Sequence, residues 1–256
     1  MNIYVLMKRT FDTEEKIVIA DKQIEQADAE FVINPYDEYA IEEALVLREA
    51  HGGEVTVVTV GEEEAGKELR MALAMGADKA VLIDSEELEE LDQRSTATLI
   101  AAFLKDKDFD IILGGNVAID GGSGQVGPRV AQLLNIPQVT TIIDLEITNG
   151  KASIVRDVEG DEETLEVALP LLVTAQQGLN EPRYPSLPGI MKAKKKPLET
   201  LELDDLNLEE EDVAANTETL ERFLPPEKQA GKQLEGEAAA QVKELVALLK
   251  SEAKVI

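Results

Sequence analysis

The residues from Gly114 to Pro128, GGNVAIDGGSGQVGP, form the stretch of this chain that best fits a phosphate-binding loop. They follow a short apolar run, 109–113, typical of a buried parallel strand, and they precede a helical pattern over 126–134. A strand, a glycine-rich turn and a helix together direct backbone N–H groups and the positive end of a helix toward an anion. The chemistry indicated is phosphate binding, although a plain glycine turn explains the pattern about as well.

The residue types within this loop suit close contact with a ligand. Glycines at 121, 122 and 124 allow positive φ and a near approach of the main chain. Ser123 can cap the following helix and donate its hydroxyl to a phosphate oxygen. The spacing matches neither the P-loop nor the dinucleotide-binding fingerprint, so the loop alone does not name its ligand.

Residues for acid–base, nucleophilic or metal chemistry are scarce. The chain has no Cys and a single histidine, His51, so thiolate nucleophiles, disulfides and histidine metal clusters are excluded. His51 ends a helical pattern just before two glycines, where a solvated residue is expected. Apart from Asp120 the loop offers no general base, which disfavours a hydrolase acting on the nucleotide. We expect no catalytic residue and no metal site.

Composition limits the remaining classes. Of 256 residues 44% are hydrophobic but only 4% aromatic, which predicts an aliphatic core in one large α/β domain with an appendage, or in two small domains. The net charge of −27 opposes binding to nucleic acid or anionic membrane. No apolar run approaches the roughly 20 residues of a membrane span, and the start leads into a strand without a basic segment or cleavage site. The expected location is the cytoplasm.

The elements that position the loop alternate between strand and helix. Strands are expected at 2–7, 54–60, 80–84 and 109–113, and helices at 38–50, 62–75, 95–105 and 126–134, the third of them starting a few residues before 95. This order predicts an α/β fold, a doubly wound and mostly parallel sheet covered by helices on both faces. A short hairpin of 16–20 with 30–33 precedes the first helix, and Asn34–Asp37 forms a turn where Pro35 stops the strand.

Ligands of such sheets bind beyond the carboxyl ends of the strands. Four separate stretches lie at or near those ends: Lys8, Asn34–Asp37, Val60-Gly61 and Gly115–Gln125. Their convergence on one edge supports a ligand site better than the glycine loop does alone.

The pattern changes after residue 137. Strands at 140–147, 152–158 and 164–169, with a hairpin signal at Asn149-Gly150, predict an antiparallel extension, and 171–174 returns to the core. We expect a nucleotide-binding α/β domain over 1–178. A proline-rich arm and extended segment follow over 179–232, where four prolines prevent a long regular element. The last part, 233–256, carries a helix at 237–250.

The arm is rich in proline and charge, and it has two interpretations. Lys192 and Lys194–Lys196 form a basic island in an acidic protein, close to the apolar Leu187, Ile190 and Met191. The segment is either a linker folded over the domain or an arm that contacts a partner through an apolar side chain framed by charges.

Specific motifs now identify a family. Those motifs are NEPRY at 180–184, LPGIMKAKKK at 187–196, Asn34-Pro35, Glu42–Ala44, MALAMGAD at 71–78, Ala118–Asp120, the acidic turn from Arg156 to Glu163, and Leu169-Pro170. In these the chain closely resembles the beta subunit of electron transfer flavoproteins. The resemblance runs from residue 1 to about 200 and is looser beyond.

The resemblance implies a heterodimer with an alpha subunit that contributes most of the site for a redox-active FAD. The beta subunit holds a buried, structural AMP, and its arm docks on acyl-CoA and related dehydrogenases. An apolar side chain at Leu187 would enter a pocket on the dehydrogenase, and electrons would pass on to a quinone oxidoreductase of the respiratory chain. The flavin supplies the redox chemistry, which agrees with the missing acid–base residues. The helix at 237–250 would pack on the alpha subunit.

Residues carried over from the family motifs define the expected sites. The backbone of 121–125 would hold phosphate, and Asn34-Pro35 would lie against the nucleoside. Tyr36 would reach the flavin edge or only pack in its turn, and Arg156 with Asp157 would face the flavin domain or form a surface ion pair. The expected cofactor contacts are Leu6, Asn34, Pro35, Tyr36, Asp37, Val60, Gly61, Asn116, Val117, Ala118, Ile119, Asp120, Gly121, Gly122, Ser123, Gly124, Gln125 and Val126, and the docking residues are Leu187, Pro188, Gly189, Ile190, Met191 and Lys192.

One departure leaves an alternative open. The loop 120–128 is shorter than in members that hold AMP, and it looks more like electron-bifurcating members, whose beta subunit holds a second FAD reduced by NADH. The complete docking arm favours the simple carrier. A further alternative is a nucleotide-sensing module similar to universal-stress proteins, which normally lack such an arm and need no alpha partner.

Overall fold

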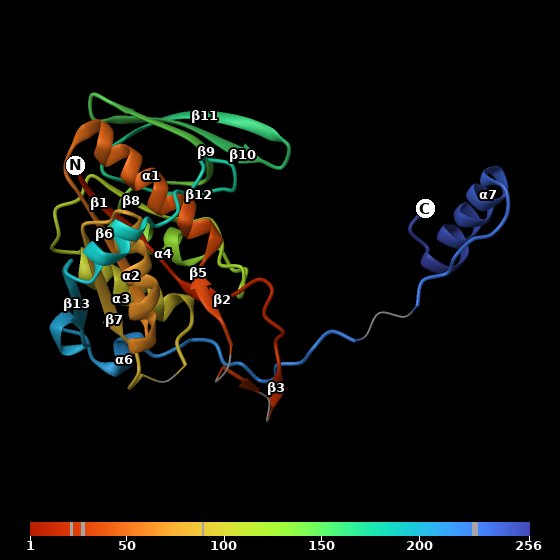
Figure 1. Ribbon diagram of the computed structural model, residues 1–256, viewed down its shortest axis with the longest axis horizontal. Helices are drawn as coiled ribbons and strands as arrows, with labels where there is room; N and C mark the ends of the chain where they lie inside the picture. Colours follow the sequence, from red (N-terminus) through yellow and green to blue (C-terminus); the bar gives the residue numbers. More distant parts are fainter. Residues whose placement is uncertain (21–22, 27–28, 89, 227–229) are drawn as a thin grey trace. The chain divides into compact units, whose positions relative to one another are not determined.

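A nine-stranded sheet organises the part of the chain that the structure describes, residues 1–20, 23–26, 29–88, 90–226 and 230–256 of a computed structural model (Figure 1). The order across the sheet is β11-β10-β9-β12-β8-β1-β6-β7-β13. Its parallel strands include β1 (Asn2–Leu6), β6 (Glu54–Gly61), β7 (Lys79–Asp84) and β8 (Ile111–Gly115). The predicted doubly wound α/β fold is confirmed.

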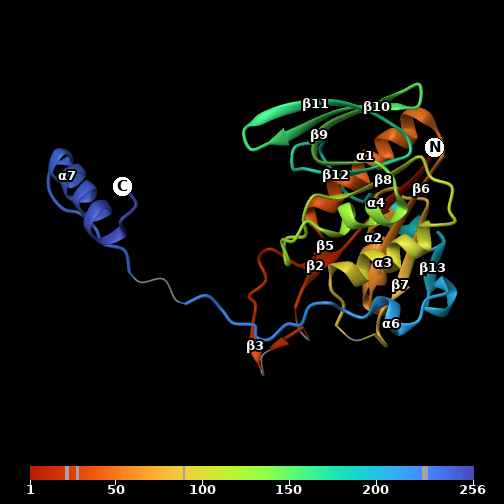
Figure 2. The same cartoon turned by 180° about the vertical axis from the view of Figure 1, so that it is seen from behind.

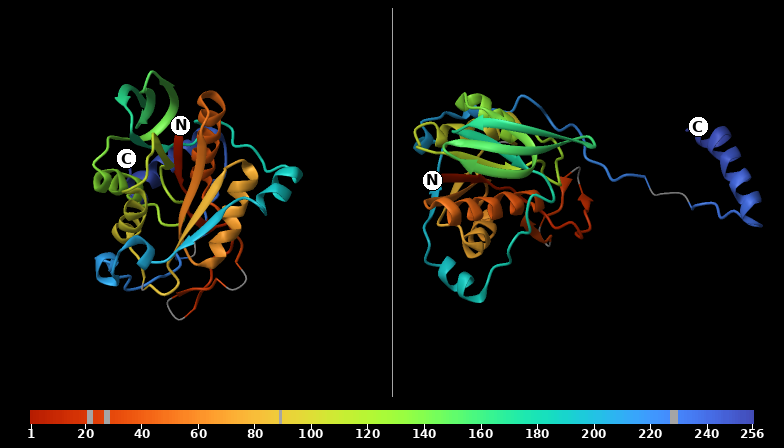
Figure 3. Two further views of the ribbon diagram at one scale, coloured as in Figure 1. Left: turned by 90° about the vertical axis from the view of Figure 1, so that its left-hand side faces the viewer. Right: turned by 90° about the horizontal axis from the view of Figure 1, so that it is seen from above.

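Continuous apolar strands follow from burial on both faces. In β1, Ile3 pairs with Val55 of β6 on one side and with Ile111 of β8 on the other. Alternate residues of these strands enter two separate aliphatic clusters. One cluster contains α1 (Pro35–His51) and α2 (Gly66–Met75), and the other contains α3 (Gln93–Leu104) and α4 (Val126–Leu134), so the sheet is covered on both faces (Figure 3, left).

The first helix begins earlier than expected. Residues 34–37 were predicted as a turn before a helix at 38–50, but α1 starts at Pro35. Proline fits the first helical position because its missing N–H would have no partner there, and its φ already suits a helix. At the other end Gly52, with φ 72°, terminates the helix as expected. The predicted helix at 62–75 is likewise split into a short 3-10 turn, η1 (Glu63–Ala65), followed by α2.

The antiparallel extension is confirmed at one end of the sheet (Figure 2). It consists of β9 (Gln138–Thr148), β10 (Lys151–Val158) and β11 (Asp161–Ala168). Asn149 and Gly150 have φ of 49° and 75°, the left-handed conformation that a tight hairpin turn requires. The chain then returns through β12 (Leu171–Ala175), which lies between β8 and β9 and is parallel to both.

The predicted pairing of 16–20 with 30–33 is wrong. Strand β5 (Phe31–Ile33) pairs with β2 (Arg9–Phe11), while β3 (Ile19–Ala20) and β4 (Gln23–Ile24) form another two-stranded sheet. Aromatic contacts explain the choice, since the rings of Phe11 and Phe31 are 4.6 Å apart. The Arg9 guanidinium also lies 3.6 Å from the Phe31 ring centre, which adds a cation–π attraction.

Regular elements continue after residue 178. They are α5 (Leu187–Ala193), β13 (Leu198–Leu201), η2 (Asp204–Leu206) and α6 (Glu210–Val213). Strand β13 was not expected. It pairs in parallel with β7, Leu198 opposite Ala80, and so forms one edge of the main sheet. By compactness, residues 1–18 and 24–220 form one unit.

The second unit comprises 19–23 and 221–256. It contains α7 (Ala238–Leu248), continued by a π-helical turn over Leu249–Ala253, close to the predicted helix at 237–250. Residues 227–229 of the expected extended segment lie outside the described residues. Among the helices described here, none is both long enough and apolar enough to cross a membrane.

Two neighbouring residues of α1 test which side of this helix packs into the aliphatic cluster that it shares with α2. Leu45 is fully buried and lies under Gly76, whereas Val46 is 41% exposed. We expect Leu45→Ala to lower the free energy of unfolding by about 2–5 kcal/mol, because it removes buried methyl groups and leaves a cavity. Val46→Ala, the matched control, should change it by about 0.5 kcal/mol or less. Urea unfolding of both variants measures the difference, and equal losses would contradict this packing.

Candidate functional site

A cavity of about 250 Å³ lies where the sequence places the ligand edge of the sheet. Its walls come from the ends of β1, β6 and β8, from the first turns of α1 and α3, and from the glycine-rich loop before α4. All of these belong to the first unit. The expected convergence of separate stretches at the carboxyl ends of the parallel strands is therefore present in the structure.

Asp37 joins three of these walls. Its carboxylate accepts the backbone N–H of Lys8 at 2.7 Å and that of Gly115 at 2.8 Å, so α1 is bonded to the ends of β1 and β8. Position 115 must be glycine, because a Cβ there would lie 2.3 Å from Asp37 Oδ1. Burial raises the pKa of Asp37 to about 7, although the two N–H bonds favour the ionised form.

Asn34 fixes the start of the loop. Its side-chain amide donates to the carbonyl of Val117 at 3.0 Å, and its Oδ1 accepts the N–H of Ile119 at 3.2 Å. The residue is 1% exposed. Such a buried, fully engaged amide holds the backbone of the loop in one conformation.

Two of the three loop glycines have the positive φ expected for them, whereas Gly121 does not, and the expected helix cap is wrong. Gly122 and Gly124 have φ of 63° and 59°, a conformation that other residues rarely adopt. Ser123 was expected to cap α4, but the N-cap position is Gln125, and its side chain makes no cap hydrogen bond. The first N–H groups of α4 therefore have no side-chain acceptor there, and they can serve an anion.

An ion pair lies beside the loop. Lys8 Nζ is 2.7 Å from Asp120 Oδ2 and also bonds the other oxygen of that carboxylate. Lys8 lines the cavity, whereas Asp120 does not. A lysine at this place can hold a phosphate as a point charge.

Sequence reasoning missed the wall formed by the start of α3. Asp92 caps this helix: its carboxylate accepts the N–H groups of Arg94 and Ser95, each at 2.9 Å. Although burial opposes ionisation, these and other hydrogen bonds hold the pKa of Asp92 at about 2. The signal was in the sequence, since Asp92 directly precedes the helix that was expected to start a few residues before 95, and α3 does begin at Gln93.

Most of the expected cofactor contacts line the cavity. They are Leu6, Asn34, Asp37, Val60, Asn116, Val117, Ala118, Gly121, Ser123, Gly124, Gln125 and Val126. Pro35, Tyr36, Gly61, Ile119, Asp120 and Gly122 are not part of its lining. The lining residues that were not among the expected contacts are Met7, Lys8, Leu91, Asp92, Gln93, Thr96, Ile100, Gly114, Gly115 and Gly127.

Tyr36 and the strands of the extension border another hollow. This hollow is also lined by Asp157, Gly160 and Gln176. Arg156 does not pair with Asp157: its Nη1 lies 3.7 Å from Glu163 on the adjacent strand, and its Nη2 donates to Thr140 at 3.1 Å. The arginine is therefore held across the hairpin, while Asp157 borders the hollow.

The predicted docking residues occupy a short helix with an apolar outer side. In α5, Leu187 is 80% exposed and Met191 is 74% exposed. Ser186 caps the helix by accepting the N–H of Gly189 at 3.1 Å. Before the helix, Arg183 bonds Glu42 at 2.8 Å and Glu49 at 2.6 Å on α1. The arm is thus attached to the domain while its large apolar side chains face outward.

The fold and the site together define a doubly wound α/β protein with a cavity at the carboxyl ends of its parallel strands. Comparison with known proteins gives the family. The sequence model described as "Electron transfer flavoprotein domain" matches residues 21–206. The chain therefore belongs to the electron transfer flavoprotein family.

Full-length relatives identify the subunit. The chain is 68% identical, over all of both chains, to "Electron transfer flavoprotein subunit beta" of Bacillus subtilis. It is 40% identical to the protein of the same name from Syntrophomonas wolfei, over all of this chain and 98% of the relative. It is also 38% identical to "Caffeyl-CoA reductase-Etf complex subunit CarD" of Acetobacterium woodii, over 94% and 95% of the two chains. This chain is a beta subunit, and its family implies a heterodimer with an alpha subunit.

The carboxyl of Asp37 gives a pH-dependent prediction. Its raised pKa means that the folded state keeps a proton that the unfolded state releases. The contribution of this one group to stability is therefore full below about pH 4 and is lost as the pH rises toward 7. We expect urea unfolding to show a steeper loss of stability between pH 5 and 8 in the wild type than in Asp37→Asn, which has no such group. Parallel slopes in the two proteins would contradict the assignment.

Proposed function

We propose that this chain is the beta subunit of a simple electron carrier in the cytoplasm. With its alpha subunit it accepts electrons from acyl-CoA and related dehydrogenases through an FAD, and it passes them to a quinone oxidoreductase of the respiratory chain. The observation that carries the proposal is α5, a capped helix that presents Leu187 and Met191 to solvent on an arm attached to the nucleotide-binding domain.

The cavity suits a structural AMP. The N–H groups at the start of α4 and Lys8 are placed for a phosphate, and Leu6, Val60 and Ile100 supply apolar surface for a base. The volume of about 250 Å³ is just below the roughly 300–1,000 Å³ of typical small-molecule sites. This size favours a mononucleotide over the much larger FAD. AMP bound here has no redox chemistry, and its role is to complete the packing of the sheet edge.

The redox-active FAD lies between the subunits in this proposal. FAD supplies the electron-transfer chemistry when bound, and this chain contributes position and exclusion of water. The hollow beside Tyr36 and Asp157, at the base of the antiparallel extension, is the surface we assign to the flavin side of the alpha subunit. We further assign α7, with Val242, Leu245 and Val246 exposed, to the alpha interface.

The bifurcating alternative is supported by one feature. Residues 120–128 make a short loop, and the cavity extends past it to Leu91 and Gln93 at the start of α3. A second FAD reduced by NADH would use this extension. Membership of the flavoprotein family removes the universal-stress alternative.

Nucleotide content separates the two carriers. The purified heterodimer, denatured and analysed by chromatography, should release one FAD and one AMP. Two FAD and no AMP would overturn the simple carrier and establish the alternative.

Leu187→Ala tests the docking arm. Loss of an exposed anchor that becomes buried in a complex typically costs about 2 kcal/mol, or roughly a 30-fold weaker interaction. We expect the KM for the heterodimer, as electron acceptor of an acyl-CoA dehydrogenase, to rise by about that factor with FAD content unchanged. The control is Leu133→Ala, which makes the same truncation at an exposed leucine outside the arm, on α4, and should leave the KM unchanged. Loss of FAD in the Leu187 variant would show that the arm serves assembly.

A further inference from the structure

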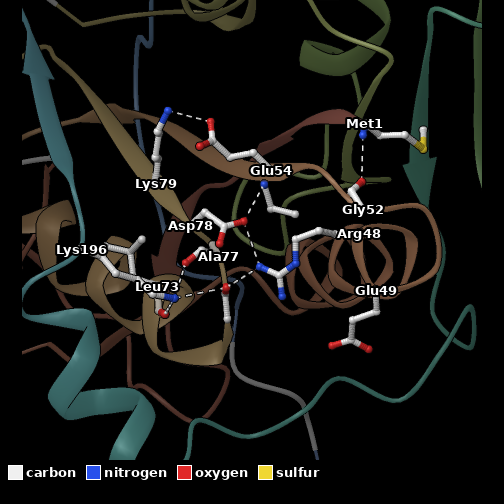
Figure 4. Close-up of polar contacts among 12 residues, drawn as sticks. Met1, Arg48, Glu49, Gly52, Glu54, Leu73, Ala77, Asp78, Lys79 and Lys196 are labelled. Carbon is white, nitrogen blue, oxygen red and sulfur yellow. Dashed lines mark hydrogen bonds and ion pairs between the residues drawn. The ribbon is translucent and has the colours of Figure 1, made fainter.

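The lysines of the basic island differ in their surroundings. Lys192, Lys194 and Lys195 are exposed, but Lys196 turns back toward the end of α2. Its ammonium donates to the carbonyl oxygens of Leu73 at 3.0 Å, Gly76 at 3.2 Å and Ala77 at 2.6 Å (Figure 4). Three bonds use all of the donors that a lysine has.

These acceptors lie at the C-terminal end of α2: Leu73 is in its last turn, Gly76 is its C-cap residue and Ala77 follows. The last carbonyl groups of an α-helix have no partner within the helix, and the negative end of its dipole attracts a cation. Arg48 on α1 also stabilises this end of α2, since its guanidinium donates to the carbonyl of Gly76 and to the carboxylate of Asp78, each at 2.9 Å. Asp78 in turn accepts the N–H of Val55 in β6 (Figure 4). The turn that supplies the carbonyl acceptors of Lys196 is therefore bonded to α1 and to the sheet.

Other contacts attach α5 to the same helix. Arg70 of α2 donates to the carbonyl of Ala193 and to that of Lys196, each at 2.8 Å. The backbones touch at Gly189, where a Cβ would lie 2.5 Å from the carbonyl oxygen of Ala74. Ala193 is buried. Figure 3 (left) shows α5 lying beside α2.

We propose that Lys196 is a positioning residue for partner docking: by closing the end of α2 it holds α5 with Leu187 and Met191 directed outward before a partner arrives. A surface ordered in advance avoids the entropy loss of ordering it on binding. The inference rests on the proposed function, because it assigns to α5 the contact with a dehydrogenase.

The test uses the assembled heterodimer with Lys196→Met. We expect the amides of 187–193 to exchange with solvent at least about tenfold faster, and the KM for the heterodimer to rise about tenfold with kcat nearly unchanged. Lys196→Arg keeps a cation with several donors and should recover part of both effects. The matched control is Lys105→Met, which removes the same charge from an exposed lysine outside the arm and should leave both readouts as in the wild type.

Other outcomes overturn the inference. Faster exchange without a change in KM would show that the hydrogen bonds of Lys196 to the end of α2 do not serve docking. A changed KM with normal amide exchange would show that the charge of Lys196 acts directly on the partner. If the heterodimer with Lys196→Met does not assemble, Arg70→Gln replaces it, because this variant removes the hydrogen bonds from α2 to the carbonyls of Ala193 and Lys196. Unchanged amide exchange and KM in that variant would overturn the inference. If Leu187→Ala also leaves the KM unchanged, the docking role of α5 itself, and hence the proposed function, is wrong.

Discussion

The structure depends on one carboxylate at the edge of the sheet. Asp37, the third residue of α1, accepts the N–H of Lys8, just after β1, and the N–H of Gly115 at the end of the neighbouring strand β8. It thus ties the first turn of α1 to the ends of β1 and β8. The loop after β8 begins from that fixed point, and Asn34 from the same turn holds the loop further along. A cavity with several walls is therefore kept open by side chains from a single turn.

The sequence predicted the parts of the molecule that depend on local pattern. Buried strands such as 54–60, the helix at 126–134 and the hairpin at Asn149-Gly150 are specified by residues within one window, and the structure has each of them. The partner of β5 and the edge strand β13 depend on contacts between distant segments. The rings of Phe11 and Phe31 decide the first, and the edge of β7 offers pairing for the second. No periodicity in those short segments encodes either choice.

The site shows the same division. The loop and the stretch around Asn34 were predicted because glycines, a proline and strand ends mark them. The start of α3 was missed as a wall, even though Asp92 is a recognisable cap, because nothing in its own neighbourhood indicates what lies opposite. Lys196 was grouped with its exposed neighbours for a similar reason: the carbonyls that receive it belong to residues 73–77.

Strand β13 begins at Leu198, two residues after Lys196, and Pro197 just before it accepts the N–H of Ala80. The arm is therefore attached to the domain at both ends: Arg183 bonds α1, and about fifteen residues later the chain pairs with the main sheet as β13. A segment fixed at both ends has little conformational freedom. Side chains on its outer surface can change while the scaffold below keeps its geometry, so under the proposed function partner recognition and nucleotide binding can diverge independently in evolution.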